Sequence, residues 1–298
     1  MKRPDLLIPV FLRLVACSGY RQIAREFRVS HTTIMRIAER LGRHCLLYQW
    51  HHVSDLEMSE AIVIDGFESF AHSQFYPCHL NLAVGAETHF TYAFAEAELR
   101  RKGTMTAWQK QRRAELERQH GRPDPKAIEK SVAELVTMLP SSTAALSVHT
   151  DEHPAYPRAF HRSGRRVQHT STPSVEARVP SNPLFPANLA DLLIRHSGAN
   201  HKRETIAFSK TLQSAVERLA IFVVWRNFAK SFSEKMQDAT PAMRLGVARA
   251  KQTVEQILDS RLFVSKMVLP ARWGGYYRRE VATLPRGLSR PHRLQYAD

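Results

Sequence analysis

Residues 61–70 read AIVIDGFESF and residues 144–156 read AALSVHTDEHPAY, and these two stretches decide the fold. Each begins as a short apolar run, which is typical of a buried strand. Each then delivers a carboxylate at or just after the end of that run: Asp65 in the first stretch and Asp151 in the second. If the two strands lie side by side, the two carboxylates come within reach of one divalent cation. The stretches therefore predict a metal site on neighbouring strands.

The segments between and after these stretches predict the rest of the fold. The expected strands are 78–84, 91–95 and 165–169, and the expected helices are 100–122, 127–139, 187–196 and 202–230. Three strands, a helix, a strand and then more helix fit an α/β fold of the ribonuclease-H-like type, a mixed sheet with flanking helices. In that fold the first strand is central and neighbours the fourth, so Asp65 and Asp151 are expected to meet.

The N-terminal 50 residues predict an all-α helix-turn-helix domain. Residues 19–44 read GYRQIAREFRVSHTTIMRIAERLGRH, in which two apolar stripes with helical spacing flank a short turn. Ser30 is placed to cap the second helix. That helix presents a polar N-terminal face suited to base edges and phosphates. We expect DNA contacts from Ser30, His31, Thr32, Thr33 and Arg36.

The charge balance also favours a polyanionic partner. The chain of 298 residues has 43 Lys and Arg against 28 Asp and Glu, a net charge of +15. Neutralising phosphates releases condensed counterions, which makes double-stranded DNA the expected partner. No apolar run approaches the length of a membrane span, so no membrane partner is expected. The three cysteines, Cys17, Cys45 and Cys78, form no CxxC pair, which favours a reducing, cytoplasmic location at the nucleoid.

A third acid is expected from a later helix, because two-metal phosphoryl transfer uses carboxylates to hold two divalent ions about 4 Å apart. Asp191 is the first choice, since it stands on a helix that begins near Pro186 and has Arg195 four residues on. Glu204 and Glu176 are the alternatives. Arg195, Lys202 and Arg203 are expected to contact phosphates.

The expected organisation has four parts. A helix-turn-helix domain at 1–50 and a linker at 51–60 precede a catalytic domain at 61–235, which carries a helical insertion near 100–122. Residues 236–298 are predicted to be a basic, partly irregular C-terminal region, and the part from Arg261 onward a DNA-contacting or disordered arm.

Several of these stretches resemble bacterial insertion-sequence transposases of the DDE type. The resemblance is carried by residues 19–44, by IVIDGFESF, by TDEHPAY and most specifically by residues 182–230, NPLFPANLADLLIRHSGANHKRETIAFSKTLQSAVERLAIFVVWRNFAK. It implies a ribonuclease-H-like domain, Mg²⁺ or Mn²⁺, and recognition of terminal inverted repeats. Asp65 and Asp151 match the first two acids of the family's triad. Where the family has a Glu on the later helix, this chain has Asn188 and then Asp191.

The sequence thus predicts a transposase that cuts and joins DNA with Asp65, Asp151 and Asp191, acting as a homodimer or a larger assembly. Two other interpretations stay open. One is an inactive or domesticated transposase that still binds DNA. The other is a helix-turn-helix regulator without catalysis.

Overall fold

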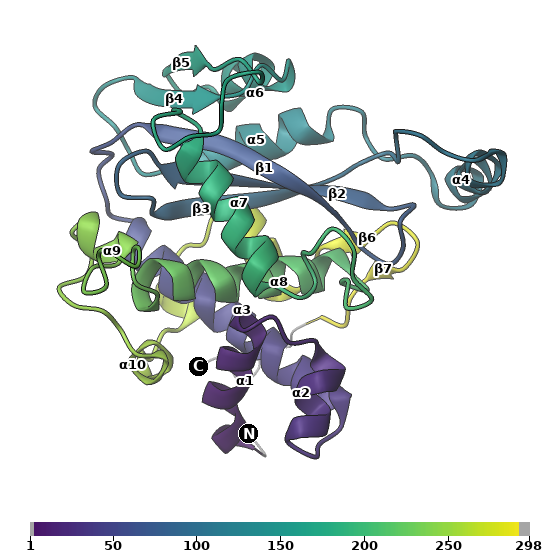
Figure 1. The fold of residues 1–298 in the computed structure, drawn as a ribbon, viewed down its shortest axis with the longest axis horizontal. Helices are drawn as coiled ribbons and strands as arrows, with labels where there is room; N and C mark the ends of the chain where they lie inside the picture. The colour runs from purple at the N-terminus through teal and green to yellow at the C-terminus, as the bar shows by residue number, and fades with distance from the viewer. Residues whose placement is uncertain (1–2, 292–298) are drawn as a thin grey trace.

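A five-stranded mixed sheet lies at the centre of the protein, in a computed structural model that describes residues 3–291. The strands are β1 Ile62–Phe70, β2 Pro77–Gly85, β3 Thr91–Glu98, β4 Leu146–Thr150 and β5 Val167–Ser171. Their order is β3-β2-β1-β4-β5. The first three strands pair antiparallel, and β4 and β5 join parallel to β1 (Figure 1). The prediction that the first strand is central and neighbours the fourth is confirmed.

The central strand depends on a glycine directly after Asp65. A Cβ atom on Gly66 would stand 2.2 Å from the carbonyl oxygen of Leu80 on β2. No side chain fits at that separation, so only glycine allows β1 and β2 to approach this closely. Gly66 therefore fixes the backbone beside the first predicted acid.

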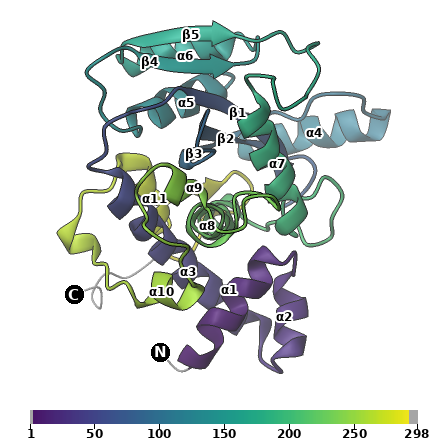
Figure 2. The ribbon, with the colours of Figure 1, turned by 60° about the vertical axis from the view of Figure 1, so that its left-hand side comes forward.

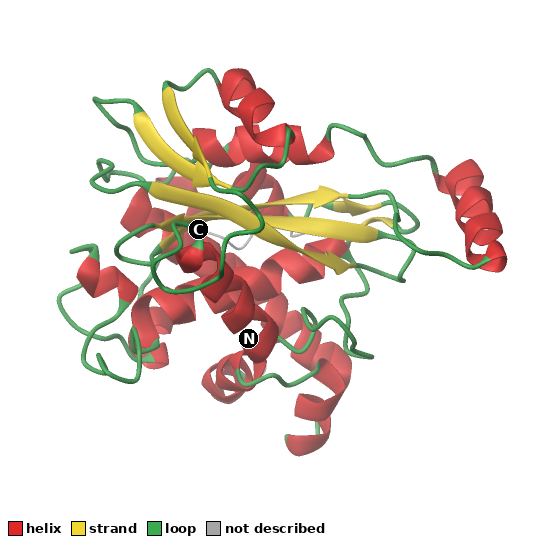
Figure 3. Cartoon of the chain, turned by 45° about the horizontal axis from the view of Figure 1, so that its top comes forward, coloured by secondary structure: helices red, strands yellow, loops and turns green. Residues whose placement is uncertain are grey.

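Helices cover both faces of the sheet, as Figure 3 shows. One face carries α5 Ala127–Thr137, which packs on β2 and β3, and α6 Ala155–Ser163, which packs on α5. The other carries α7 Phe185–Ser197, which crosses β1 and β2, and α8 Leu212–Val224 beneath it (Figures 1 and 2). The charged helix α4 Ala107–His120 projects from the body and buries none of its residues. The fold is therefore mixed α/β with a sheet between helical layers.

Three helices precede the sheet: α1 Leu7–Val15, α2 Tyr20–Glu26 and α3 His31–Val53. Ser30 caps α3, since its side chain accepts a hydrogen bond from the Thr32 amide at 3.2 Å. α3 extends through Val53, so the first residues of the expected linker are helical. Its buried face packs along α8, and both belong to the same hydrophobic cluster as the sheet.

The segment 202–211 was expected to be helical, and that prediction is wrong. It forms turns, and α8 begins only at Leu212, where Thr211 caps it. A buried polar network closes this loop: the Asn200 amide donates to Ser209 Oγ at 2.9 Å and contacts the His201 ring at 3.0 Å. The Asn200–Ser209 bond joins residues nine positions apart, which would lie about 13 Å from one another along a continuous helix.

The expectation of a disordered arm from Arg261 onward is wrong for the described residues 271–283, whereas the alternative, that this segment contacts DNA, stays a prediction. The short helices and strands after α8 include α9 Pro241–Arg244, α10 Val254–Asp259, α11 Ala271–Arg278, β6 Ala282–Thr283 and β7 Gly287–Leu288. Trp273 and Tyr276 on α11 are each 1% exposed. The Trp273 indole donates to the Phe94 carbonyl at 3.1 Å, and the Tyr276 hydroxyl bonds Glu96, both on β3. Aromatic burial therefore anchors this segment, while residues 292–298 of the basic tail lie outside the described part.

Candidate functional site: an acidic cluster between β1, β4 and α7

Asp65 lies on β1, and Asp151 comes directly after the neighbouring parallel strand β4. The last paired residues of β1 and β4 are Val63 and His149, each two residues before one of these acids. Because side chains on a strand alternate between faces, the Asp65 carboxylate emerges on the same face as Val63. The negative charge of Asp151 acts on this carboxylate, so the two acids lie near one another. The sheet therefore brings the first two predicted acids together.

Asp191 comes to the same face from α7. Phe67, two residues beyond Asp65, lies under the Arg195 guanidinium, whose Cζ is 5.0 Å from the ring centroid. Arg195 also donates to the Glu68 carbonyl at 3.0 Å, which ties α7 to β1. Asp191 lies one helical turn before Arg195 on the same side of α7. It thus faces the strand that carries Asp65.

The electrostatics of the carboxylates reflect this proximity. The pKa of Asp65 is raised to about 6, mainly by burial and also by the negative charge of Asp151, while the hydrogen bond from the Gly66 amide opposes the rise. Burial also raises the pKa of Asp191 well above its usual value, with the charge of Asp65 adding to the effect. Like charges in a poorly solvated site disfavour ionisation of one another. Such a site is stabilised by any cation that enters it.

The hydrogen bonds of the cluster leave acceptors free. Asp65 Oδ1 accepts from the Gly66 amide at 2.7 Å, and Asp151 Oδ1 accepts from the His153 amide at 2.9 Å. Asp191 Oδ1 is buried and has no hydrogen-bond partner in the described part of the chain. A buried oxygen without a donor is costly, and a bound cation would satisfy it. Within residues 3–291, however, no three His, Cys, Asp or Glu side chains converge tightly enough to hold a metal ion together.

Two further residues at this site were missed from the sequence. Tyr156 is buried on α6, and burial together with the charges of Asp65, Asp151 and Asp191 raises its pKa well above the usual value. Arg178 is an exposed cation whose charge lowers the pKa of both Asp65 and Asp191. Tyr156 closes the TDEHPAY stretch and is the second residue of α6, so its closeness to Asp151 in the sequence was the available signal. Arg178 lies in a loop without periodicity, and no local pattern indicates it.

The alternative third acids lie elsewhere. Glu176 and Glu204 are both exposed, and neither contributes to the pKa shifts of Asp65 or Asp191. Asp191 is therefore the acid that the fold places with Asp65.

Some of the predicted DNA-contacting residues are exposed, and others are partly buried or have a structural role. His31, Thr32 and Arg36 are exposed on the outer face of α3, whereas Thr33 is half-buried and Ser30 serves as the cap. Lys202 and Arg203 are exposed in the loop before α8. Arg195, by contrast, is half-buried against β1 and holds α7 in place.

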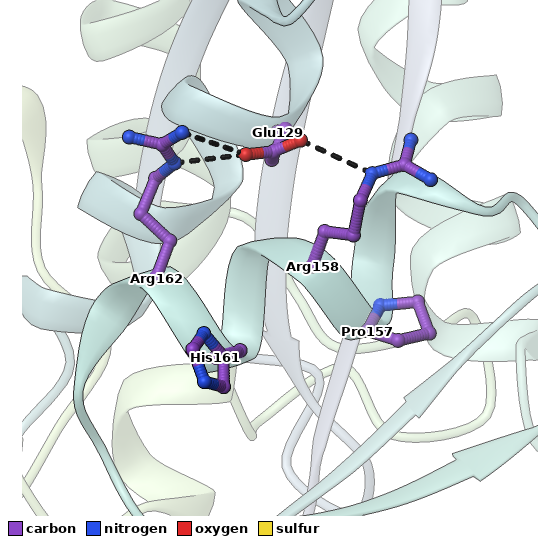
Figure 4. Close-up of a pocket in the computed structure, with 5 residues that line it drawn as sticks. All are labelled: Glu129, Pro157, Arg158, His161 and Arg162. Carbon is purple, nitrogen blue, oxygen red and sulfur yellow. Dashed lines mark hydrogen bonds and ion pairs between the residues drawn. The ribbon is translucent and has the colours of Figure 1, made fainter.

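A separate hollow of about 570 Å³ lies over α5 and α6 (Figure 4). Its lining residues are Glu129, Pro157, Arg158, His161 and Arg162. Glu129 is buried and pairs with Arg158 at 3.1 Å and with Arg162 at 2.8 Å. One carboxylate thus offsets part of the positive charge, and the arrangement fastens α6 to α5.

Comparison with protein-family models gives no match, and comparison with curated proteins gives no significant match either. Among the described residues, no helix is both long enough and apolar enough to cross a membrane. The function is therefore argued from the site alone.

Proposed function

We propose that the protein is a metal-dependent DNA phosphoryl-transfer enzyme of the DDE transposase type. The observation that carries the proposal is the placement of Asp65 on β1 beside Asp151, which directly follows the adjacent parallel strand β4, with Asp191 of α7 close enough for the charge of Asp65 to act on it. Two-metal phosphoryl transfer uses carboxylates from different elements of the fold to hold its cations. The strand order β3-β2-β1-β4-β5 is compatible with a ribonuclease-H-like catalytic domain.

The N-terminal helices support a DNA-binding role. α2 and α3 are joined by the short segment 27–30, and the first turns of α3 leave His31, Thr32 and Arg36 exposed. These features are compatible with a helix-turn-helix, whose second helix would read the major groove. The net charge of +15 favours the same partner.

Asp65, Asp151 and Asp191 are the residues that would hold Mg²⁺ or Mn²⁺, because such cations prefer oxygen ligands and the Asp191 Oδ1 atom has no other described partner. Bound there, the cation would neutralise charge that develops on the phosphate and favour the attacking oxygen. Arg178 is placed to contact a phosphate beside the carboxylates. Arg195 positions Asp191 through its bond to β1.

The reaction proposed is an in-line displacement at phosphorus, performed twice at one site. Water first attacks a backbone phosphorus, the bond from phosphorus to the 3′-oxygen breaks, and that oxygen leaves as a 3′-hydroxyl. The 3′-hydroxyl then attacks a target phosphodiester, and the target's own 3′-oxygen leaves. Paired DNA ends require two active sites, so a homodimer or larger assembly is part of the proposal.

Nicking of supercoiled plasmid in the presence of Mg²⁺ or Mn²⁺ tests the catalytic proposal. Asp65→Asn and Asp191→Asn should each lower the nicking rate by more than about 100-fold, because loss of even an outer partner of a metal ligand costs 10–100-fold. Glu204→Gln makes the same chemical change at an exposed acid and should nick as the wild type does. Nicking retained in Asp65→Asn would refute the assignment.

A second readout does not need activity. Carboxylate repulsion destabilises the cation-free fold, so Asp191→Asn should raise the melting temperature in EDTA. Mg²⁺ should stabilise the wild type more than this variant, since ligand binding to the folded state adds stability. Equal Mg²⁺ effects on both proteins would contradict the ligand role.

Two alternative proposals are a DNA-binding regulator without catalysis and an inactive transposase that still binds DNA. Either protein would bind duplex DNA but would not nick it in the presence of Mg²⁺ or Mn²⁺. The plasmid assay separates both from the catalytic proposal directly.

A further inference from the structure

A basic groove lies on the outer face of α3, away from the acidic cluster. It is a hollow of about 410 Å³. Its lining residues are Thr32, Met35, Arg36, Glu39, Arg40, Arg43, Arg279, Arg290 and Pro291. Five of these are arginines and one is an acid, so the lining has a net charge of +4.

One wall of the groove is a stripe along α3. Thr32, Arg36, Arg40 and Arg43 recur at intervals of three or four residues, so they share one side of the helix. Arg36 and Arg40 are exposed, and neither forms an ion pair with a described residue. Two cationic side chains therefore project from this wall with their charge uncompensated.

The other wall comes from the C-terminal segment 279–291. Arg279 ends α11 with a left-handed backbone (φ 66°), which turns the chain away from the helix axis. Its side chain fixes the segment: Nε donates to the buried Glu217 at 2.8 Å, and Nη2 pairs with Glu39 at 3.1 Å. Nη1 donates to the Arg290 carbonyl at 3.0 Å. Arg279 thus joins α8, α3 and the C-terminal segment at the base of the groove.

This anchoring holds Arg290 beside α3. Arg290 is exposed, and within residues 3–291 its guanidinium has no carboxylate partner. The walls of the groove thus carry three positive charges without an ion-pair partner, on Arg36, Arg40 and Arg290. Arg279 at the base of the groove is instead paired with Glu39 and Glu217. Arginine guanidinium groups match phosphate oxygens in geometry and charge. Thr32 and Arg36 link the groove to the predicted base-reading face.

We propose that this groove binds the phosphodiester backbone of duplex DNA, with the C-terminal segment completing the surface that α3 begins. The proposal rests on the proposed DNA-binding function and names the second element of that interface. Phosphate contacts set position and affinity without reading sequence, so the groove would hold DNA while the first turn of α3 reads bases.

The test measures binding of the full-length protein to a fluorescein-labelled 30-base-pair duplex by anisotropy, in EDTA, from 50 to 300 mM KCl. Each lost phosphate contact lowers the salt slope by about 0.9 and affinity by about eight-fold at 0.1 M salt. Arg40→Ala/Arg290→Ala should therefore reduce the slope by about 1.8 and weaken binding by roughly 60-fold.

Two further proteins control for charge and folding. Arg118→Ala/Arg249→Ala removes two exposed arginines elsewhere on the surface and should leave binding within about two-fold of wild type, since these side chains lie outside the groove. Arg40→Lys/Arg290→Lys keeps both charges and should retain most of the salt slope, because lysine binds phosphate as a point charge.

Equal losses in the groove variant and the Arg118/Arg249 control would overturn the proposal, as would unchanged binding in the groove variant. The assay contains no divalent metal, so its result is independent of catalysis. If Asp65→Asn still nicked plasmid, the catalytic proposal would be refuted but the groove proposal would not. If the groove variant bound DNA as the wild type does, the groove proposal would be refuted but the catalytic proposal would not.

Discussion

Gly42 lies where α3 crosses α8, and we predict that Gly42→Ala destabilises the protein. A Cβ atom at Gly42 would stand 2.8 Å from Glu217 Cβ, 2.9 Å from its carbonyl oxygen and 3.0 Å from its Cα. Favourable contacts between carbon atoms lie near 3.5–4.0 Å. All three obstructing atoms are backbone or Cβ atoms, so no rotamer change relieves them, and α3 and α8 must move apart.

The magnitude follows from two opposing contributions. Overpacking in a closely packed interior costs about 1–3 kcal/mol. Replacing glycine by alanine inside a helix raises the free energy of unfolding by about 1 kcal/mol, because alanine has the higher helix propensity. The net loss should be up to about 2 kcal/mol in the free energy of unfolding, which lowers the melting temperature by up to about 8 °C in a chain of this size.

Gly275→Ala on α11 is the matched control. The nearest atom to a Cβ at Gly275 is Glu280 Oε2 at 3.9 Å, an ordinary contact. The control should therefore gain up to about 1 kcal/mol from helix propensity alone. Urea unfolding followed by circular dichroism measures both variants. If Gly42→Ala proved at least as stable as Gly275→Ala, the close crossing of α3 and α8 would be refuted.

Two further predictions concern buried polar groups. Burial lowers the pKa of His201 from 6.5 to about 3, so the unfolded chain takes up a proton first as the pH falls. The neutral ring therefore stabilises the folded state above pH 6.5, and this stabilisation is lost as the pH falls towards 3. Between pH 7.5 and 5 the free energy of unfolding should fall by about 2 kcal/mol for this reason. Urea unfolding at both pH values should show that His201→Phe removes this component, and an unchanged pH dependence would contradict it. Asn227 accepts a hydrogen bond from the Thr91 amide at 3.0 Å and donates one to Gln49 Oε1 at 3.1 Å. Asn227→Leu should lower the free energy of unfolding by about 2–4 kcal/mol in the same assay, because both partners stay buried without these bonds. A loss under about 0.5 kcal/mol would show that the two groups find other partners.

The sheet could be predicted from the sequence because its signals are local. The apolar runs before Asp65 and Asp151 and the order of elements were enough to place the first strand beside the fourth. Ser30 was likewise found as a cap, since capping depends on residues within one turn.

What the sequence missed depends on contacts between distant residues. The loop 202–211 has helix-compatible composition, but bonds from Asn200 to Ser209 close it. The aromatic residues near Trp273 read as part of a basic tail, although their partners lie on β3. Arg178 has no local pattern and meets Asp65 and Asp191 only through the tertiary fold.

The length of α3 has a consequence for where a nucleic acid could be cut. Its 23 residues span about 35 Å, from the exposed His31 to the foot of the sheet. That span is close to one full turn of B-form DNA. Under the proposed function, DNA bound at the exposed first turn of α3 would therefore be held at the end of this helix that lies away from the sheet and its carboxylates. Recognition and scission would then concern different nucleotides, unless the double helix curves back or a second molecule supplies the scissile strand.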